Sequence, residues 1–392
     1  MLATNRFQLE TRVTSVKKYI TDVIKIMITK LIKPNKKLSV LRVIFFLRLL
    51  FGSYSKISTS KKVCFYVRIY CILINSVASY FAVKPYITFR RVNLTEAYYY
   101  SYIEYILNVV ISFIYSDDNI HQYLRAIKIG DIVTGVKKSP IISYDVYLSL
   151  SFFLALRILG IALIYISLNL QSTMMWSRFY TLISMDYNNI LILIIFSLFQ
   201  NRMRLLKILF EENLNSLNLK NNNNNFSVNV TACIRKLKKC LYNYDNLLDN
   251  ILLVNRPVQI MVILMPWFSM VLYFHLSIYL RRCVLLLLDL LITYYVIEST
   301  QVLYILCSIA ILMELVQYHI EKIKANLIKE IIKCSDESLL HELEAALQYL
   351  GQRPFKYTIM RVLVLDIKLI FIYFSLVITY VLVITQLTHF RA

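Results

Sequence analysis

The chain has 392 residues, of which 58% are hydrophobic and 17% are charged, and its formal net charge is +21. A soluble domain is about 45–50% apolar and about 25% charged, so this composition excludes an ordinary soluble protein. The mean hydropathy of +0.59 argues against a soluble nucleic-acid-binding protein as well. The apolar bulk and the basic excess together indicate a membrane protein with several spans and basic cytosolic loops.

Seven stretches are apolar and long enough to cross a bilayer as helices, which takes about 20 residues. The predicted spans are 64–84, 96–116, 145–168, 179–200, 257–280, 284–306 and 364–387. Pro266 lies inside the fifth span and is expected to kink it. The stretch 38–52 is shorter and contains Arg42 and Arg48, so we expect an interfacial or packed helix there. The sequence therefore predicts an all-α membrane protein with seven transmembrane helices.

Basic residues lie mostly on one side of these spans. Of the 44 lysines and arginines, 34 fall in the N-terminal region and in the long loops on its side of the membrane, which are 117–144, 201–256 and 307–361. Because basic loops stay in the cytosol, we expect a cytosolic N-terminus and an extracellular C-terminus. The predicted divisions are a cytosolic N-terminal region (1–63), spans 1–4 (64–200), a cytosolic helical loop with an Asn-rich turn (201–256), spans 5–6 (257–306), a cytosolic helical anchor segment (307–363), and span 7 with a short outer tail (364–392).

Apolar residues at alternating spacings of four and three recur in the predicted cytosolic parts. The first stripe consists of Val230, Ile234, Leu237, Leu241, Tyr244, Leu248 and Ile251. Two more follow the sixth span, at Val316, Ile320, Ile323 and Leu327 and at Leu340, Leu343, Leu347 and Leu350. Such stripes are typical of packed helices. They predict either helical hairpins that extend spans 4 to 6 or helices that pack between subunits, and the sequence is compatible with both.

No sequence pattern indicates catalysis, a metal or a cofactor. The HExxH pattern of zinc proteases and the glycine-rich phosphate loops do not occur, and the chain has only 5 glycines. The 5 histidines are scattered, and no cysteine or histidine pair has the spacing of metal ligands. We therefore expect a protein that is not an enzyme and has no metal or cofactor.

The seventh span carries a semi-polar stripe on an otherwise apolar helix. At i, i+4, i+7, i+11 and i+14 the stripe contains Ser375, Thr379, Leu382, Gln386 and His389. Polar groups inside a bilayer face protein or a water-filled path. The stripe predicts either a pore lining or interhelical hydrogen bonding, and spacing alone favours neither.

The same span carries a short motif. Thr379 and Tyr380 are followed by five residues and then by Gln386 and Leu387, which resembles the T-Y-five residues-Q-F motif of insect gustatory receptors. The run 353–374 resembles that family's approach to its last helix, and the layout of seven spans with a cytosolic N-terminus is similar to the family's. Leu387 stands where the family has phenylalanine, and Thr385 lies in a spacer that is normally apolar.

This resemblance implies a ligand-gated, non-selective cation channel, a homo- or heterotetramer in which the seventh helices line a central pore. The pore-lining residues would be Gln386, near the outer end, with Thr379, Leu382 and Ser375. Tyr380 and Leu387 would be motif residues that pack beside the pore face. Lys368 continues the stripe, so a cation pore would need either an acid such as Asp366 to pair with it or a wide, wet vestibule.

The outer halves of spans 2 to 6, where the resemblance implies a ligand pocket, are rich in tyrosine and contain several acids, which are costly in a bilayer. The candidate ligand-binding residues are Tyr99, Tyr102, Glu104, Tyr165, Tyr180, Asp186, Tyr273, His275, Asp289 and Tyr294. Tyrosine at a span end is also typical of the membrane interface, and Arg157 could pair with Glu104, Asp186, Asp289 or Glu298 as a structural bridge. An aromatic pocket with carboxylates would suit an apolar or amine-bearing ligand, such as a bitter plant compound, better than a free sugar.

The resulting interpretation is a gustatory receptor in the plasma membrane, in the dendrite of gustatory receptor neurons. Its partners would be a small-molecule tastant, membrane lipid and other receptor subunits, with no nucleic acid. One alternative is an odorant-receptor-type subunit, against which the Thr379-Tyr380 pair argues. A secondary transporter would show internal repeats, which are not seen. The placement of basic residues argues against a G-protein-coupled receptor.

Overall fold

A computed structural model describes residues 39–54, 60–88, 95–115, 118–134, 144–168, 172–218, 226–254, 256, 258–262, 287–359 and 363–389. The chain divides into two units, Met1–Leu47 and Arg48–Ala392. Of the first unit, residues 39–47 are described and are helical. All the contacts discussed below lie within the second unit.

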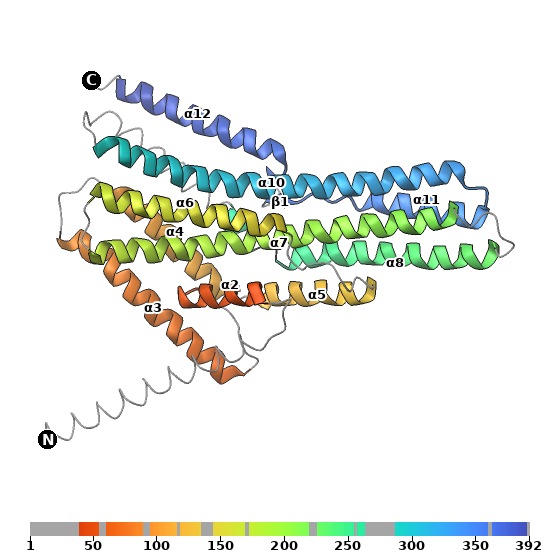
Figure 1. Ribbon diagram of the computed structural model, residues 1–392, viewed down its shortest axis with the longest axis horizontal. Coiled ribbons are helices and arrows are strands. Elements are labelled where there is room, and N and C mark those ends of the chain that lie inside the picture. The colour runs from red at the N-terminus through yellow and green to blue at the C-terminus, as the bar shows by residue number, and fades with distance from the viewer. Residues whose placement is uncertain are drawn as a thin grey trace. The chain divides into compact units, whose positions relative to one another are not determined.

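Helices account for most of the described residues (Figure 1). In chain order they are α2 (Ser39–Leu50), α3 (Lys61–Thr88), α4 (Thr95–Tyr115), α5 (Asp118–Thr134), α6 (Tyr144–Leu168), α7 (Ser172–Asn218), α8 (Phe226–Leu253), α10 (Leu287–Lys333), α11 (Glu337–Gln352) and α12 (Ile367–His389). Between α11 and α12, β1 (Thr358–Ile359) pairs antiparallel with β2 (Leu363–Val364), with Thr358 opposite Val364. The predicted all-α fold class is confirmed.

Helices occupy six of the seven predicted span positions, namely those of α3, α4, α6, α7, α10 and α12. Most of the remaining span, 257–280 with Pro266, lies outside the described residues. By length and composition, three described segments could cross a membrane: Lys61–Lys84, Phe179–Asn215 and Val296–Lys333. The apolar stretches found on α4, α6 and α12 are shorter. Between 38 and 52 the chain forms α2, a separate helix of 12 residues, as expected.

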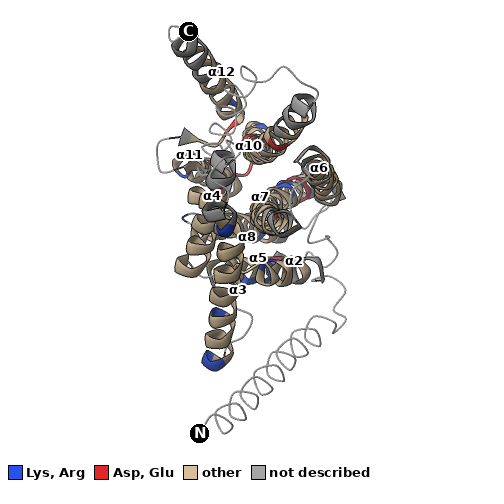
Figure 2. Ribbon diagram, turned by 90° about the vertical axis from the view of Figure 1, so that its left-hand side faces the viewer, with Lys and Arg blue, Asp and Glu red and all other residues tan. Residues whose placement is uncertain are grey.

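Three of these helices, α3, α6 and α12, present large apolar side chains on the outside of the bundle. Phe65 and Leu73 on α3, Ile158 on α6 and Phe371 on α12 are between 60% and 69% exposed. In Figure 2 the tan of uncharged residues covers most of α3 and α6. Surfaces this apolar mark contact with lipid or with another protein. By contrast, 83% of the most apolar window of α7 is buried, so α7 is the centre of the bundle.

Beyond their apolar stretches, α7 and α10 continue as more polar helices that pack with α8 and α11 (Figure 1). The stripes found in the sequence supply the buried faces: Leu237 and Tyr244 of α8 and Leu343 and Leu350 of α11 are at most 2% exposed. Burying a large apolar side chain contributes about 1.5–3 kcal/mol. At these positions the stripes are packing faces within one chain.

A polar clasp joins the end of α11 to α8. Arg353 forms ion pairs with Asp245 and Asp249 of α8. The hydroxyl of Tyr244 donates a hydrogen bond of 2.9 Å to the backbone carbonyl of Arg353. Tyr349 of α11 donates to Asp245 at 2.6 Å. Because Arg353 is about one-third exposed, the clasp fixes the geometry of the two helices more than it stabilises them.

The last helix begins at Ile367, whereas hydropathy placed the span from 364. Residues 363–364 pair with β1 instead, and Asp366 caps the helix, because its Oδ1 accepts the backbone N–H of Lys368 at 3.0 Å. An aspartate at this position favours a helix start directly after it, which the hydropathy average does not register.

The turn after α2 depends on a glycine. Gly52 has φ +79° and lies so close to Asn75 of α3 that a Cβ would be 2.5 Å from the Asn75 Oδ1 atom. The Asn75 side-chain amide donates a hydrogen bond of 2.9 Å to the Gly52 backbone carbonyl. A larger residue would both strain the backbone and push this amide away, so the turn requires glycine.

Candidate functional site

The predicted pore face of α12 is turned away from the rest of the chain. Ser375, Thr379, Leu382 and Gln386 are all exposed. The helix packs against α10, and among its described side chains Leu369 and Tyr373 are buried. The side chains of Tyr380, Leu387 and His389 lie outside those described. One chain therefore leaves the semi-polar stripe uncovered along most of its length.

Lys368 is exposed at the first turn of the same helix. Asp366, the predicted partner for its charge, instead accepts the backbone N–H of Lys368 as the helix cap. The Lys368 amine forms no ion pair with a residue in the described part of the chain.

A buried charge cluster joins three helices at the level of the predicted ligand pocket. Arg157 of α6 contacts both carboxylate oxygens of Asp186 on α7, with Nη2 2.7 Å from Oδ1 and Nε 2.5 Å from Oδ2. Its Nη1 atom also pairs with Glu298 of α10. All three residues are at most 8% exposed. Sequence reasoning left open which acid Arg157 contacts, and the structure shows that it holds two of the four candidates.

Acid outnumbers base at this cluster. Glu104 of α4 is 8% exposed and interacts electrostatically with Glu298, Arg157 and Asp186. Its carboxyl group makes no ion pair or side-chain hydrogen bond with another residue that the structure describes. One guanidinium group, that of Arg157, therefore lies near three carboxyl groups. Its nitrogen atoms contact Asp186 and Glu298 but not Glu104. A cationic group entering beside Glu104 would meet a carboxyl group that has no basic partner of its own.

An aromatic cluster lies at neighbouring positions of α4 and α7. Tyr105 and Val109 of α4 pack with Met185 of α7, and Tyr102 and Tyr180 pack against this core. The Tyr105 ring centroid is 6.2 Å from that of Tyr102 and 6.1 Å from that of Tyr180. Tyr105 was not among the predicted site residues. Its position three residues after Tyr102, which places the two on one helix face, is the signal that could have identified it.

Other predicted ligand residues separate into three groups. Tyr294 is 4% exposed and interacts electrostatically with Arg157, so it belongs to the charge cluster. Tyr165 is 63% exposed and lies on the outer surface of α6. The remaining residues, or their side chains, lie outside the described part: Tyr99, Tyr273, His275 and Asp289. Within the described residues, no group of three or more His, Cys, Asp or Glu side chains is arranged to hold a metal ion.

Comparison with known proteins identifies the fold. No protein-family profile matches the chain, and no curated protein matches its sequence. The structure is similar to that of the insect olfactory receptor OR5 from Machilis hrabei, with a TM-score of 0.62 and 11% identity. It is also similar to the same receptor in complex with eugenol, with a TM-score of 0.56 and 12% identity. In both comparisons the match covers 88% of this chain and 97% of the other. The chain thus has the insect olfactory receptor fold.

Proposed function

We propose that this chain is a subunit of a ligand-gated, non-selective cation channel of the insect chemoreceptor type, with gustatory specificity. Four chains assemble in the plasma membrane around a pore lined by α12. The channel opens when a small molecule binds among α4, α6, α7 and α10, in the dendrite of a chemosensory neuron. The insect olfactory receptor fold supports the architecture, and the motif in α12 supports the gustatory type.

The observation that carries the channel assignment is the uncovered face of α12. If Gln386 faced hydrocarbon, its side-chain amide would be left without hydrogen bonds, which costs several kcal/mol. Placing the same face on a shared axis gives this amide water or its counterparts in other subunits. The apolar side chains Phe371 and Leu376, which are 69% and 52% exposed, would then contact lipid or the neighbouring subunits.

The charge cluster supports a ligand that carries an amine. Glu104 is buried without a basic partner of its own among the described residues, and Tyr294, which interacts with Arg157, supplies an aromatic ring at the cluster. A protonated amine can pair with a carboxylate while its substituents pack on aromatic rings. Many bitter plant compounds combine these two features, whereas a free sugar has neither.

An odorant-type receptor is the second candidate, and a specific observation favours it. The two solved structures compared above are of one insect olfactory receptor, and one of them is its complex with eugenol. The Thr379-Tyr380 pair of the motif favours the gustatory type. The ligand class that opens the channel therefore distinguishes the two candidates.

Voltage-clamp recording of cells that express the full chain tests both parts of the proposal. The panel contains an alkaloid amine, an uncharged glycoside, a free sugar and eugenol. We expect cation currents with the alkaloid, and changes in ion block and relative permeability in Gln386→Ala and Gln386→Glu. Gln348→Ala is the matched control, because Gln348 is an exposed glutamine on α11, away from the proposed pore.

Three results separate the alternatives. Currents evoked by eugenol alone would indicate an odorant-type receptor. Currents whose reversal potential and block are the same in Gln386→Glu as in the unmodified channel would contradict the pore assignment. Alkaloid currents that survive Glu104→Gln with unchanged sensitivity would contradict the amine site but not the channel.

A further inference from the structure

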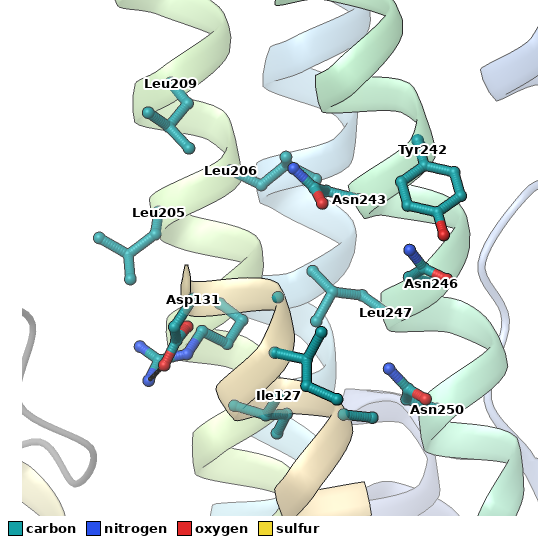
Figure 3. A pocket seen from close by; sticks show the side chains of 14 residues that line it. Ile127, Asp131, Leu205, Leu206, Leu209, Tyr242, Asn243, Asn246, Leu247 and Asn250 are labelled. Atoms are coloured by element: carbon teal, nitrogen blue, oxygen red, sulfur yellow. Dashed lines mark hydrogen bonds and ion pairs between the residues drawn. The ribbon is translucent and has the colours of Figure 1, made fainter. Parts of the chain in front are cut away.

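A cavity of about 220 Å³ lies between α5, α7 and α8, away from both sites described above. Figure 3 shows its walls: Leu205, Leu206 and Leu209 come from α7, Ile127 and Asp131 from α5, and Asn243, Asn246, Leu247 and Asn250 from α8. The cavity is thus mainly apolar, with polar groups at two places, which is typical of a small-molecule site. Pockets for drug-sized ligands begin at about 300 Å³, so this cavity suits a smaller molecule, about the size of a single ring.

Three amides form a column on one wall of the cavity. Asn243, Asn246 and Asn250 are spaced i, i+3 and i+7, so they lie on one face of α8 (Figure 3). Asn243 is only 6% exposed. None of the three amides makes a side-chain hydrogen bond with another residue in the described part of the chain. A ligand that both donates and accepts would form hydrogen bonds with these amides.

The opposite wall carries an ion pair. Arg202 Nη2 lies 2.7 Å from Asp131 Oδ2, and the two side chains are 6% and 21% exposed. They are the charged residues among those that line the cavity. Because each neutralises the other, the cavity offers no free counter-charge to an ion. An ionic ligand would lose its hydration without compensation, whereas a neutral ligand would not.

From these observations we propose that the cavity between α5, α7 and α8 is a second binding site, for a neutral small molecule that carries a hydrogen-bond donor and acceptor, such as a carboxamide. Its apolar body packs on Leu205, Leu206 and Leu247, and its polar group binds the Asn243 amide. A molecule bound there contacts three helices at once. The site therefore regulates how α5, which follows α4 in the chain, is held against α7 and α8.

The test uses the full chain in lipid nanodiscs and three fluorinated probes of one size. These are 4-(trifluoromethyl)benzamide, the corresponding benzoate, and the corresponding benzylammonium ion, with empty nanodiscs as the background. Binding is measured by ¹⁹F NMR line broadening over a concentration series. We expect saturable binding of the benzamide. The dissociation constants of the two ions should be at least tenfold larger.

Two variants locate the site. Leu247→Trp fills the cavity and should abolish benzamide binding, whereas Leu252→Trp adds the same bulk to an exposed position of α8 and should leave it within twofold. Asn243→Leu keeps the volume, and loss of one hydrogen bond should weaken benzamide binding about fivefold to tenfold. A fourth probe, trifluorotoluene, has no polar group, so Asn243→Leu should not weaken its binding. The ratio of the benzamide and trifluorotoluene dissociation constants does not depend on what fraction of the protein is folded.

Any of three outcomes would overturn the proposal. The first is benzamide binding no stronger than that of empty nanodiscs. The second is equal binding to the unmodified chain and to Leu247→Trp. The third is binding of the benzoate or the benzylammonium ion as tight as that of the benzamide. None of these depends on channel activity, so the second site can fail while the proposed function stands.

Discussion

Replacing Arg157 by methionine should destabilise the helix bundle more than any other single change at the charge cluster. The change Arg157→Met removes the cation but keeps most of the side-chain volume. Asp186 and Glu298 then remain buried, at 2% and 8% exposure, with no cation between them. Because both would be acceptors only, the site would hold two repelling carboxylates or would have to bind protons.

The expected magnitude follows from the burial of the pair. Breaking a buried ion pair by removing one partner costs about 3–5 kcal/mol. The entropy of unfolding is about 2.1 cal/mol/K per residue near the midpoint. For a chain of 392 residues, the loss corresponds to a fall in Tm of about 4–6 °C. Glu298→Gln should cost only about 1 kcal/mol, because the two contacts of Arg157 with Asp186 remain.

Thermal unfolding of the purified chain in one detergent measures these differences. The informative variant is Arg157→Met combined with Asp186→Asn and Glu298→Gln, which removes every charge of the ion pairs and should recover most of the lost stability. Arg204→Met, at an exposed position of α7, controls for the loss of one positive charge. If Arg157→Met unfolds at the same temperature as Glu298→Gln, or if the triple variant is no more stable than Arg157→Met, the cluster does not hold the bundle as argued.

Three further predictions concern the helices α8 and α11. Leu343→Ala should destabilise the chain by about 2–5 kcal/mol, because Leu343 is fully buried. Arg353→Ala should cost less than about 1 kcal/mol, because Arg353 is partly solvated. Thermal unfolding checks this, since Leu343→Ala should have the lower Tm. Asp336→Ala should cost about 1 kcal/mol, because Asp336 caps α11 with a 2.8 Å bond from the backbone N–H of residue 339. Hydrogen bonds from the Ser338 side chain and from the Leu339 backbone N–H lower the pKa of Asp336. The stability that this cap contributes is therefore present at neutral pH and is lost as the pH falls through the lowered pKa. Equal acid sensitivity of Asp336→Ala and the unmodified chain would refute this. Burial raises the pKa of the Cys240 thiol to about 11, so maleimide should label Cys334, which is more accessible, at least about tenfold faster, as mass spectrometry of the peptides would show.

The parts of the fold that depend on local composition could be predicted from the sequence. Apolar length alone placed six described helices, and the stripe through Leu237 and Tyr244 identified the buried face of α8. On α12 the same periodicity identifies which residues share a side, because residues four and seven apart lie on one face of a helix. These features need no knowledge of which helices meet.

The parts that depend on long-range contacts could not be predicted. Arg157 and Glu298 are 141 residues apart, so the sequence could offer a set of possible acids but not select two of them. The cavity was missed for the same reason, although the spacing of Asn243, Asn246 and Asn250 was visible. From the sequence alone, three amides on one helix face are equally consistent with a solvated surface and with a cavity wall. Only the positions of α5 and α7 show that these amides line a cavity.

The two long helices have a mechanical consequence. α7 and α10 each run for 47 residues without interruption, which makes rods of about 70 Å at 1.5 Å per residue. Asp186 and Glu298 lie nearer the first end of each rod, so the far ends are about 50 Å away. A continuous helix has no hinge to absorb a tilt. If a ligand binds at these acids as proposed, a tilt of either helix there would displace its far end by a proportionally larger distance.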